Sequence, residues 1–405
     1  MKKHIISGLT TCVALSFICA PAYAVDGPKP VDLDGGPLGL LNFSAAADGY
    51  FYLQSGTSDN SHTSIAGSKE AGAEVNAWMV QLRKSTGLVQ FTVQLAEYQD
   101  INLGTNKPSQ VNGNRYTTGP LRTAFVSLAP TPDFKFSVGQ IGSLEGYESA
   151  FPWNNPVAFR TVLNDPQNSN SRGVEADYAH GPFSGSLVFG DGYDTGVWNY
   201  LQYLATAKID SSNSITIYGG VPLGTTGPNT FAYGEGGASG GGANGNGGQG
   251  QLAAVNSTMV GGWYTWKSGD LAITPEVQGQ WTQRLTKYAN VVSGGVSDNI
   301  PKGTGNFGAA LFATYQFGDS PYSIGGFGEY ARSYGSGPQD AWFIAPNASL
   351  LGFAVAPGYQ YKQLFSRVNI GYVHLLNSGT PAAGFGNQGT GKNQGVVTLE
   401  FALVY

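Results

Sequence analysis

The last thirteen residues of the chain, 393–405, read NQGVVTLEFALVY. Every second position counted back from the carboxyl terminus is apolar, and the positions between carry small or polar residues; the apolar row is Tyr405, Leu403, Phe401, Leu399 and Val397. A period of two is that of a β-strand with two unlike faces. The ending therefore predicts a final strand whose apolar face meets an apolar environment.

The first residues predict export. Two lysines precede a mostly apolar stretch, 5–19, and Ala22-Tyr23-Ala24 supplies a small-x-small cleavage pattern. The apolar stretch is short against the ~20 residues that a membrane-spanning helix needs. We therefore interpret residues 1–24 as a secretory signal peptide. Both cysteines of the chain lie within it, and its loss would change the formal net charge from −5 to −7.

The composition of the chain favours β structure in which apolar residues alternate with others. Charged residues make up 12% of the chain, about half of the usual quarter, and the chain has 60 glycines, 22 tyrosines and 21 phenylalanines. No further run of 18 apolar residues exists, which argues against membrane-spanning helices. No basic run exists either, so we expect no nucleic-acid partner.

Sixteen candidate strands follow a poorly regular lead-in at 25–45, and their connections alternate between short and long. We expect seven short turns at 84–87, 130–133, 179–182, 210–213, 267–270, 318–321 and 361–364. The eight long links are 56–72, 99–119, 143–169, 190–197, 222–254, 283–304, 332–345 and 377–393. This alternation is typical of an outer-membrane barrel with short periplasmic turns and long outer loops. The fold class is therefore all-β, a transmembrane antiparallel β-barrel of about 16 strands (14–18) over residues 46–405.

Aromatic residues near the short turns support the barrel over a soluble β-sandwich or β-helix. They fit an interfacial girdle and include Phe134, Tyr178, Phe183, Trp266, Phe317, Tyr322, Tyr361, Phe365 and Tyr405. The last strand should pair with the first, near 46–56, because an open edge is not tolerated in hydrocarbon. Its ending also resembles the carboxyl-terminal signal of outer-membrane proteins, which implies insertion by the assembly machinery.

The polar rows of the strands should face a lumen too wide for side chains alone to fill. As pore-wall residues we expect Glu175, Asp177, Lys208, Glu276 and Arg367. The long link 143–169 is too apolar to lie in water and should pack into or over the barrel. In the first case Glu145, Glu148, Arg160 and Asp165 would face Arg83, Arg122 and Lys135 across a constriction. In the second case the link is a lid over the outer mouth.

The residues give little support for catalysis. The glycine-rich stretch 235–250 lacks the Lys-Ser/Thr of a phosphate-binding loop, and His62, His180 and His374 have no metal-site spacing. We expect no metal and no cofactor. One alternative is a lipid-modifying barrel enzyme that uses His374 with Ser378, although four residues separate them rather than the two found in outer-membrane phospholipases. Another is a plugged, non-conducting structural or surface-binding barrel.

Two neighbouring stretches resemble the OmpL-like β-barrel porin family. The strand end VGQIG leads to Gly146-Tyr147-Glu148, where the family has a VGQFG-type end and a Gly-Tyr-Glu step. A strand running from Arg172-Gly173-Val174 to Tyr178 and the short loop Gly190-Asp191-Gly192 then match the next family motifs. The best match covers about 134–221. The resemblance implies an outer-membrane pore, and analogy with general porins suggests a homotrimer.

Together these features predict a passive outer-membrane channel for small hydrophilic solutes and ions. Its expected partners are outer-membrane lipid, the assembly machinery and the solutes themselves. The acidic net charge of the mature chain weakly favours cations, although charges at a constriction would matter more.

Overall fold

A computed structural model of the chain describes residues 28–57, 70–99, 101, 103, 120–227, 251–287, 292–293, 296–297, 300, 302–335, 347–379, 384–386 and 388–405. The expected signal peptide, 1–24, lies outside these residues, as do His62 and the glycine-rich stretch 235–250.

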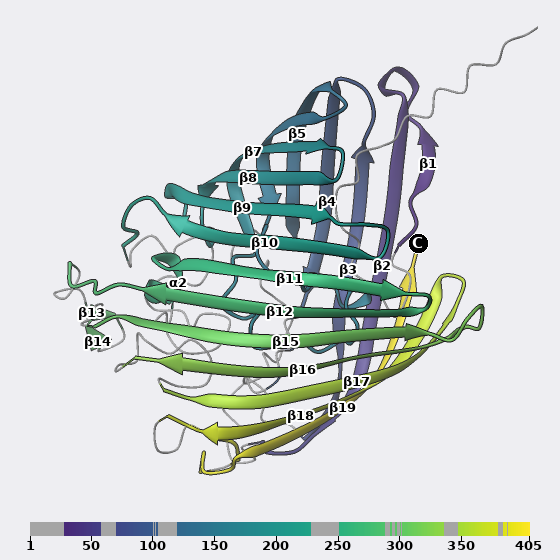
Figure 1. The fold of residues 1–405 in the computed structure, drawn as a ribbon. Coiled ribbons are helices and arrows are strands. Elements are labelled where there is room, and N and C mark those ends of the chain that lie inside the picture. Colours follow the sequence, from purple (N-terminus) through teal and green to yellow (C-terminus); the bar gives the residue numbers. More distant parts are fainter. Residues whose placement is uncertain are drawn as a thin grey trace, which may run out of the picture.

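Within the described residues, sixteen long strands form one closed antiparallel barrel (Figure 1). They are β2 (Leu40–Gln54), β3 (Ala71–Lys84), β4 (Val89–Tyr98), β5 (Leu121–Thr131), β6 (Phe134–Gly142), β7 (Asn170–His180), β8 (Phe183–Asp191), β9 (Trp198–Lys208), β10 (Asn213–Pro222), β11 (Thr258–Ser268), β12 (Leu271–Thr282), β15 (Thr304–Gln316), β16 (Tyr322–Tyr334), β17 (Ser349–Tyr361), β18 (Leu364–Asn377) and β19 (Asn393–Val404). The expected fold class and strand number are confirmed.

The barrel closes where the sequence predicts, between the last strand and the first. β19 pairs with β2 in a continuous antiparallel register from Val404↔Ala46 to Val396↔Gln54. Backbone hydrogen bonds between Ala45 and Tyr405 extend this pairing to the final residue, at 2.6 and 2.7 Å. The last strand therefore leaves no unpaired edge along the seam.

Small elements complete the described chain. β1 (Val31–Asp34) pairs with the start of β2, so the stretch 25–45 is more regular than the expected lead-in. The other pieces are η1 (Gly36–Leu38), η2 (Pro152–Asn154), α2 (Gln251–Val255) and the ribbon of β13 (Val292–Ser293) with β14 (Val296–Ser297). None of the helices among the described residues has the length and apolarity that crossing a membrane requires.

The seven connections expected to be short are turns of two to five residues, and they gather at the right-hand end of the barrel in Figure 1. We call this the turn end. α2 and the β13–β14 ribbon lie at the other end, which we call the loop end. Pro275 does not break β12, and Gly325-Gly326 does not break β16: both strands pair with β15 in a continuous register through these residues.

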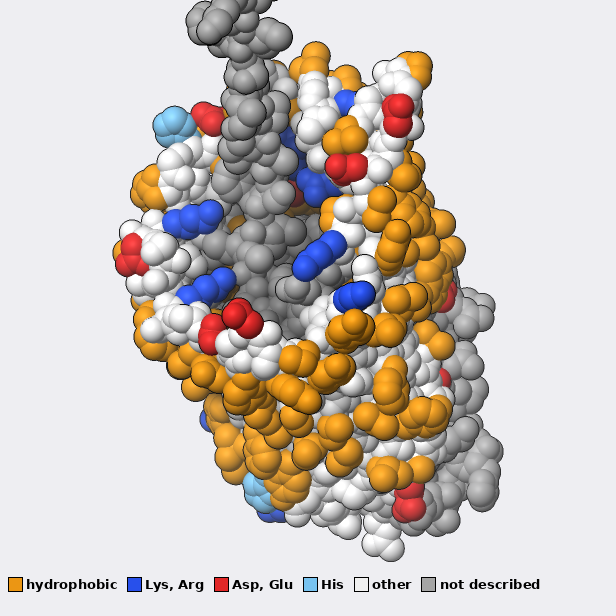
Figure 2. All heavy atoms as spheres, turned by 90° about the vertical axis from the view of Figure 1, so that its right-hand side faces the viewer, with side chains coloured by type: hydrophobic (Ala, Val, Ile, Leu, Met, Phe, Trp, Pro, Cys, Tyr) orange, Lys and Arg blue, Asp and Glu red, His pale blue; other side chains and the backbone are white. Residues whose placement is uncertain are grey.

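The outer face of the barrel is apolar. The terminal row Leu399, Phe401, Leu403 and Tyr405 points outward, with 40–50% of each side chain exposed. Figure 2 looks onto the turn end and shows hydrophobic side chains over the sides of the barrel. Eight of the nine expected girdle aromatics are exposed at this end. Phe365 is the exception: it is 3% exposed and points inward, so its assignment to the girdle was wrong.

Candidate functional site in the barrel lumen

The connection between β6 and β7, residues 143–169, lies inside the barrel, and we call it the inner loop. Most of its residues are buried. It pairs with a neighbouring connection through two backbone hydrogen bonds, from Arg160 N to Ile101 O at 3.0 Å and from Leu103 N to Arg160 O at 3.1 Å. Of the two expected arrangements, the structure therefore has the one in which this link folds into the barrel.

The inner loop packs mainly against one side of the lumen, formed by the inward faces of β2, β12 and β15–β19, and its edges also contact β3, β4, β9 and β11. We call this side the covered wall, and nearly every inward side chain on it is buried. Its glycines make room for the loop. A Cβ atom on Gly325 would lie 2.0 Å from the carbonyl oxygen of Pro156, and one on Gly308 would lie 2.5 Å from Leu163. Only residues without a side chain allow so close an approach.

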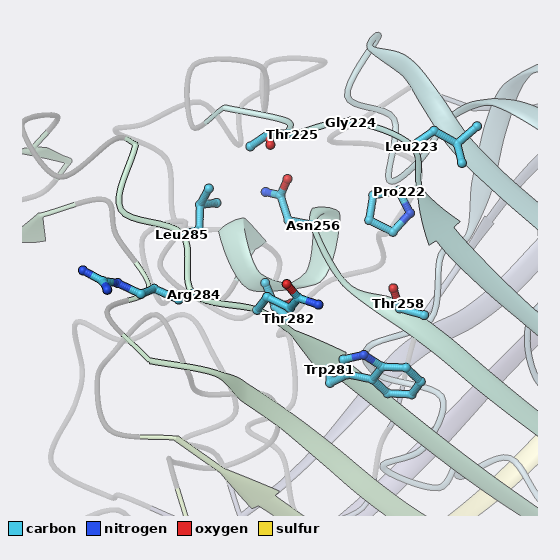
Figure 3. A pocket seen from close by; sticks show the side chains of 11 residues that line it. Pro222, Leu223, Gly224, Thr225, Asn256, Thr258, Trp281, Thr282, Arg284 and Leu285 are labelled. Atoms are coloured by element: carbon cyan, nitrogen blue, oxygen red, sulfur yellow. The ribbon is translucent and has the colours of Figure 1, made fainter.

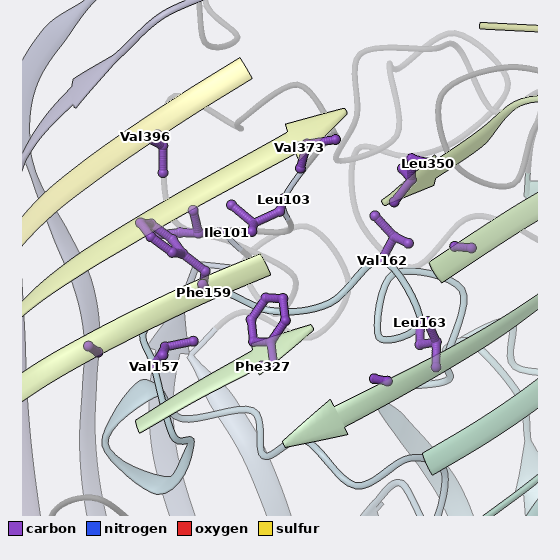
Figure 4. Packing of buried hydrophobic residues seen from close by; sticks show 14 of the residues in the cluster. Ile101, Leu103, Val157, Phe159, Val162, Leu163, Phe327, Leu350, Val373 and Val396 are labelled. Atoms are coloured by element: carbon purple, nitrogen blue, oxygen red, sulfur yellow. The ribbon is translucent and has the colours of Figure 1, made fainter. Parts of the chain in front are cut away.

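Apolar side chains form most of this contact. Val157, Phe159, Val162 and Leu163 of the inner loop cluster with Phe327, Leu350, Val373 and Val396 of the covered wall (Figure 4). A second cluster holds Phe151 and Trp153, whose rings stack at 4.9 Å, against Phe365 and Ala402. Each cluster buries large apolar side chains, which stabilise the docked loop at roughly 1.5–3 kcal/mol per fully buried residue.

Polar side chains of the covered wall bind the backbone of the inner loop. The Glu276 carboxylate accepts from Tyr147 N at 3.0 Å, Glu329 from Val162 N at 2.8 Å, and the Asn369 amide oxygen from Ala158 N at 2.9 Å. An irregular segment inside a barrel needs such partners, because unpaired buried N–H groups are costly. These wall residues supply them.

Arg367 is the most heavily used of these anchors. Its side chain is fully buried and forms an ion pair with Glu400 at 2.7 Å. The same guanidinium donates to the carbonyl oxygens of Asn155 at 2.8 Å and Pro152 at 3.0 Å. One cation therefore satisfies a wall carboxylate and two loop carbonyls at once.

Two expected pore-wall residues need correction. Glu276 and Arg367 do point inward, but they are 2% and 1% exposed, and the inner loop separates them from any water-filled path. They hold the loop instead of lining a channel.

Three expected constriction residues also need correction, because Glu145, Glu148 and Arg160 are buried. Glu145 accepts from Tyr200 Oη and Asn168 N, both at 2.8 Å, and Glu148 accepts from the backbone and hydroxyl of Thr161. Burial raises the pKa of Glu145 to about 7 and that of Glu148 to about 8. These carboxyls organise the loop, while the fourth expected residue, Asp165, is half-buried.

The opposite side of the lumen differs. We call it the open wall and define it by these partly exposed inward residues of β3–β11: Glu74, Gln81, Arg83, Gln90, Phe125, Lys135, Asp177, Ser184, Ser186, Leu204, Lys208, Ser214, Trp263 and Lys267. Most lie toward the turn end, where Figure 2 shows Lys and Arg side chains around the mouth of the barrel. Polar groups here remain in contact with water.

The remaining expected residues fall on or beside the open wall. Lys135 forms an ion pair with Asp177 at 3.0 Å. Glu175 is the neighbouring inward residue of β7, on the loop-end side of Asp177, and it is 8% exposed. Arg122 sits at a bulge in β5 and stacks over the rings of Tyr98 and Phe151 at 5.5 and 5.4 Å. Through Phe151, Arg122 contacts the edge of the inner loop. It therefore lies at the boundary between the two walls.

A separate groove of about 370 Å³ opens at the loop end, between the ends of β10 and β12 (Figure 3). Asn256 lies in it and exchanges hydrogen bonds with the backbone of Thr226, at 2.8 and 2.9 Å. These hydrogen bonds connect the segment after α2 to the segment that follows β10. Among the described residues, His, Cys, Asp and Glu side chains nowhere gather in threes that could hold a metal ion.

Sequence reasoning did not identify Glu329 and Asn369 as loop anchors. Both occupy inward positions of regular strands, and the sequence pattern around them does not distinguish them from polar residues that line a lumen. The usable signal was the inward glycines near them, Gly325 and Gly371, because a glycine in a strand often marks close approach of another backbone.

Comparisons with known proteins agree with this architecture. A family model described as "Putative beta-barrel porin-2, OmpL-like" matches residues 40–404. No curated protein matches the sequence.

Among solved structures, the chain is similar to an anion-selective porin from Comamonas acidovorans, with 9% identity, a TM-score of 0.57, and coverage of 93% of this chain and 100% of that one. It is also similar to OmpF of Salmonella typhi (11%, TM-score 0.52, 93% and 100%) and OmpT of Vibrio cholerae (9%, TM-score 0.51, 90% and 98%). At such low identity these likenesses show the fold alone.

Proposed function

Because the chain belongs to the OmpL-like β-barrel porin family, we propose that it forms a water-filled channel through the bacterial outer membrane. Small hydrophilic solutes and ions would cross it by passive diffusion. No catalytic step is part of this proposal.

The observation that carries the proposal is the one-sided position of the inner loop. The loop is fixed to the covered wall by hydrogen bonds and apolar packing, and the open wall keeps a polar, partly exposed surface. A sixteen-stranded barrel is wide enough that one loop does not fill it. The path we propose runs between the inner loop and the open wall.

The apolar outer face supports placement in a membrane. Its apolar rows would contact lipid, and the long connections would lie outside the cell. We further propose that the row Leu399, Phe401, Leu403 and Tyr405 is read by the outer-membrane assembly machinery, since it forms a regular exposed stripe on the last strand. A homotrimer is the assembly that we would test first by crosslinking.

The plugged barrel is the rival supported by a specific observation, namely the extensive burial of the inner loop. The enzyme alternative has less support, because four residues separate His374 from Ser378 in the sequence, although His374 Nδ1 does have an amide partner, Asn393 Oδ1, at 2.7 Å.

Single-channel recording in planar bilayers tests the proposal. Purified protein, shown to be folded by its heat-dependent gel mobility, should give stable open steps. Folded and inserted protein without conductance would contradict the channel and favour the plugged barrel. Hydrolysis of phospholipid that is lost in His374→Ala but kept in His180→Ala would instead establish the enzyme.

A further inference from the structure

The charges inside the barrel are sorted by sign. The inward acidic residues of the covered wall are all buried, between 0% and 5% exposed: Asp48, Glu276, Glu329 and Glu400. Their carboxylates are engaged with the inner loop, with Arg367 or with Asn76. The two buried glutamates of the inner loop, Glu145 and Glu148, are likewise turned into the loop. These six carboxyl groups are therefore shielded from the lumen.

The open wall carries the opposite sign. Its partly exposed cations are Arg83, Lys135, Lys208 and Lys267. Asp177 and Glu74 stand against them as partly exposed acids: Asp177 is already paired with Lys135 at 3.0 Å, and Glu74 lies opposite Tyr50 of β2, toward the loop end. Among the described residues, Arg83, Lys208 and Lys267 have no ion pair. Water in the lumen therefore meets an excess of positive charge.

Acidic residues in the turns do not offset this excess inside the lumen. Asp133 pairs with His180 at 2.9 Å, Asp210 accepts from Ser212 N at 2.7 Å, and Asp270 accepts from Gly318 N at 3.1 Å. All three lie in connections at the turn end, outside the strands. Their carboxylates lie in the turns, whereas Lys208 and Lys267 occupy inward positions of strands.

We propose that the channel prefers small anions, such as solutes bearing a carboxylate or phosphate, over cations of similar size. This inference rests on the proposed function, because it concerns the same path. Lys208 and Lys267 are the selectivity residues at the turn end: each is the exposed last inward position of its strand. Net charge favours the opposite preference, but it counts the buried carboxylates as though they faced the lumen.

Reversal potentials across a planar bilayer under a KCl gradient test the preference. The native channel should show a chloride-to-potassium permeability ratio above one. In the double variant Lys208→Glu/Lys267→Glu this ratio should fall several-fold, to below one. The matched control is Lys362→Glu, because Lys362 lies at the same end but in a turn, over the ring of the outward-facing Tyr361. It should keep the native ratio.

The outcomes separate the two proposals. A native channel that conducts but prefers potassium overturns the anion preference and leaves the channel standing. A double variant with normal conductance and an unchanged ratio overturns the role of these two lysines. Absence of conductance in folded native protein contradicts the proposed function itself, and the anion preference falls with it.

Discussion

The covered wall and the open wall belong to one sheet and follow one alternation, yet their inward residues have different fates. On β16 and β18 the inward row combines glycines and apolar residues with a few buried polar anchors, such as Glu329 and Asn369. On β8 and β9 it includes Ser184, Ser186 and Lys208, which keep contact with water. The difference lies in whether a loop packs on the strands. An inward polar residue lines a channel only where nothing covers it.

The largest effect should come from the buried ion pair of the covered wall. Replacing Arg367 by Met leaves Glu400 buried without its cation and two loop carbonyls without a donor. Breaking such a pair costs about 3–5 kcal/mol. We expect this loss in the free energy of unfolding, measured in denaturant with detergent-solubilised protein.

The open wall provides the control for this change. Lys208→Met should alter the free energy of unfolding by no more than about 0.5 kcal/mol, because Lys208 is exposed and outside any ion pair of the described residues. Equal losses in the two variants would mean that the walls do not differ in the way described.

A smaller effect should follow pH, through the two buried glutamates of the inner loop. Their raised pKa values, about 7 and about 8, mean that the folded protein favours the neutral carboxyl. The resulting stability is fully present below the unfolded value near 4.5 and is lost as pH rises through 7 to 8. We therefore expect the melting temperature to fall as pH rises from about 5 to about 8.

Glu148→Gln isolates this contribution. The amide keeps an acceptor for Thr161 N but cannot ionise. The variant should therefore melt with a flatter pH profile than the native protein between pH 5 and 9. Profiles that run parallel would assign the pH dependence to other groups.

The third effect concerns backbone contact between loop and wall. Gly325→Ala places a methyl group 2.0 Å from the Pro156 carbonyl oxygen, so the loop must shift. Overpacking of this kind costs roughly 1–3 kcal/mol. Gly328→Ala on the same strand has no atom within 4 Å of its new methyl group and should be neutral. Thermal melting of both variants compares them directly, and a neutral Gly325→Ala would argue against the docked loop.

The sequence predicted the barrel well because alternation and turn residues are local signals. The final row Leu399, Phe401, Leu403 and Tyr405 identified the outer face, and the seam between β19 and β2 followed from the need to close the sheet. The fate of inward residues could not be predicted in this way. Glu276 and Lys208 both occupy inward positions, but the inner loop, which lies far away in sequence, buries Glu276 in the middle of β12, and Lys208 at the end of β9 stays exposed.

For the inner loop, too, the sequence predicted the packing but not the orientation of the charged side chains. Its apolar residues, such as Phe159 and Leu163, correctly indicated that it would pack, because exposing them to water is costly. Its charged residues were expected to face the pore. They turn inward instead, since Glu145 and Glu148 bind N–H groups of the loop that no strand satisfies. A charged side chain in an irregular buried segment can hydrogen-bond to the backbone of that segment instead of facing the lumen.

Thiol accessibility tests the difference between the two walls most directly. The only cysteines, Cys12 and Cys19, lie in the expected leader, so the mature protein would offer a thiol-free background. Ser184→Cys and Ser323→Cys form a matched pair, because each is the second residue of its strand at the turn end, on the open and the covered wall respectively. A charged, water-soluble thiol reagent added to the folded protein should modify Cys at 184 rapidly and leave Cys at 323 unmodified. Equal modification at both positions would contradict a lumen with one covered and one open wall.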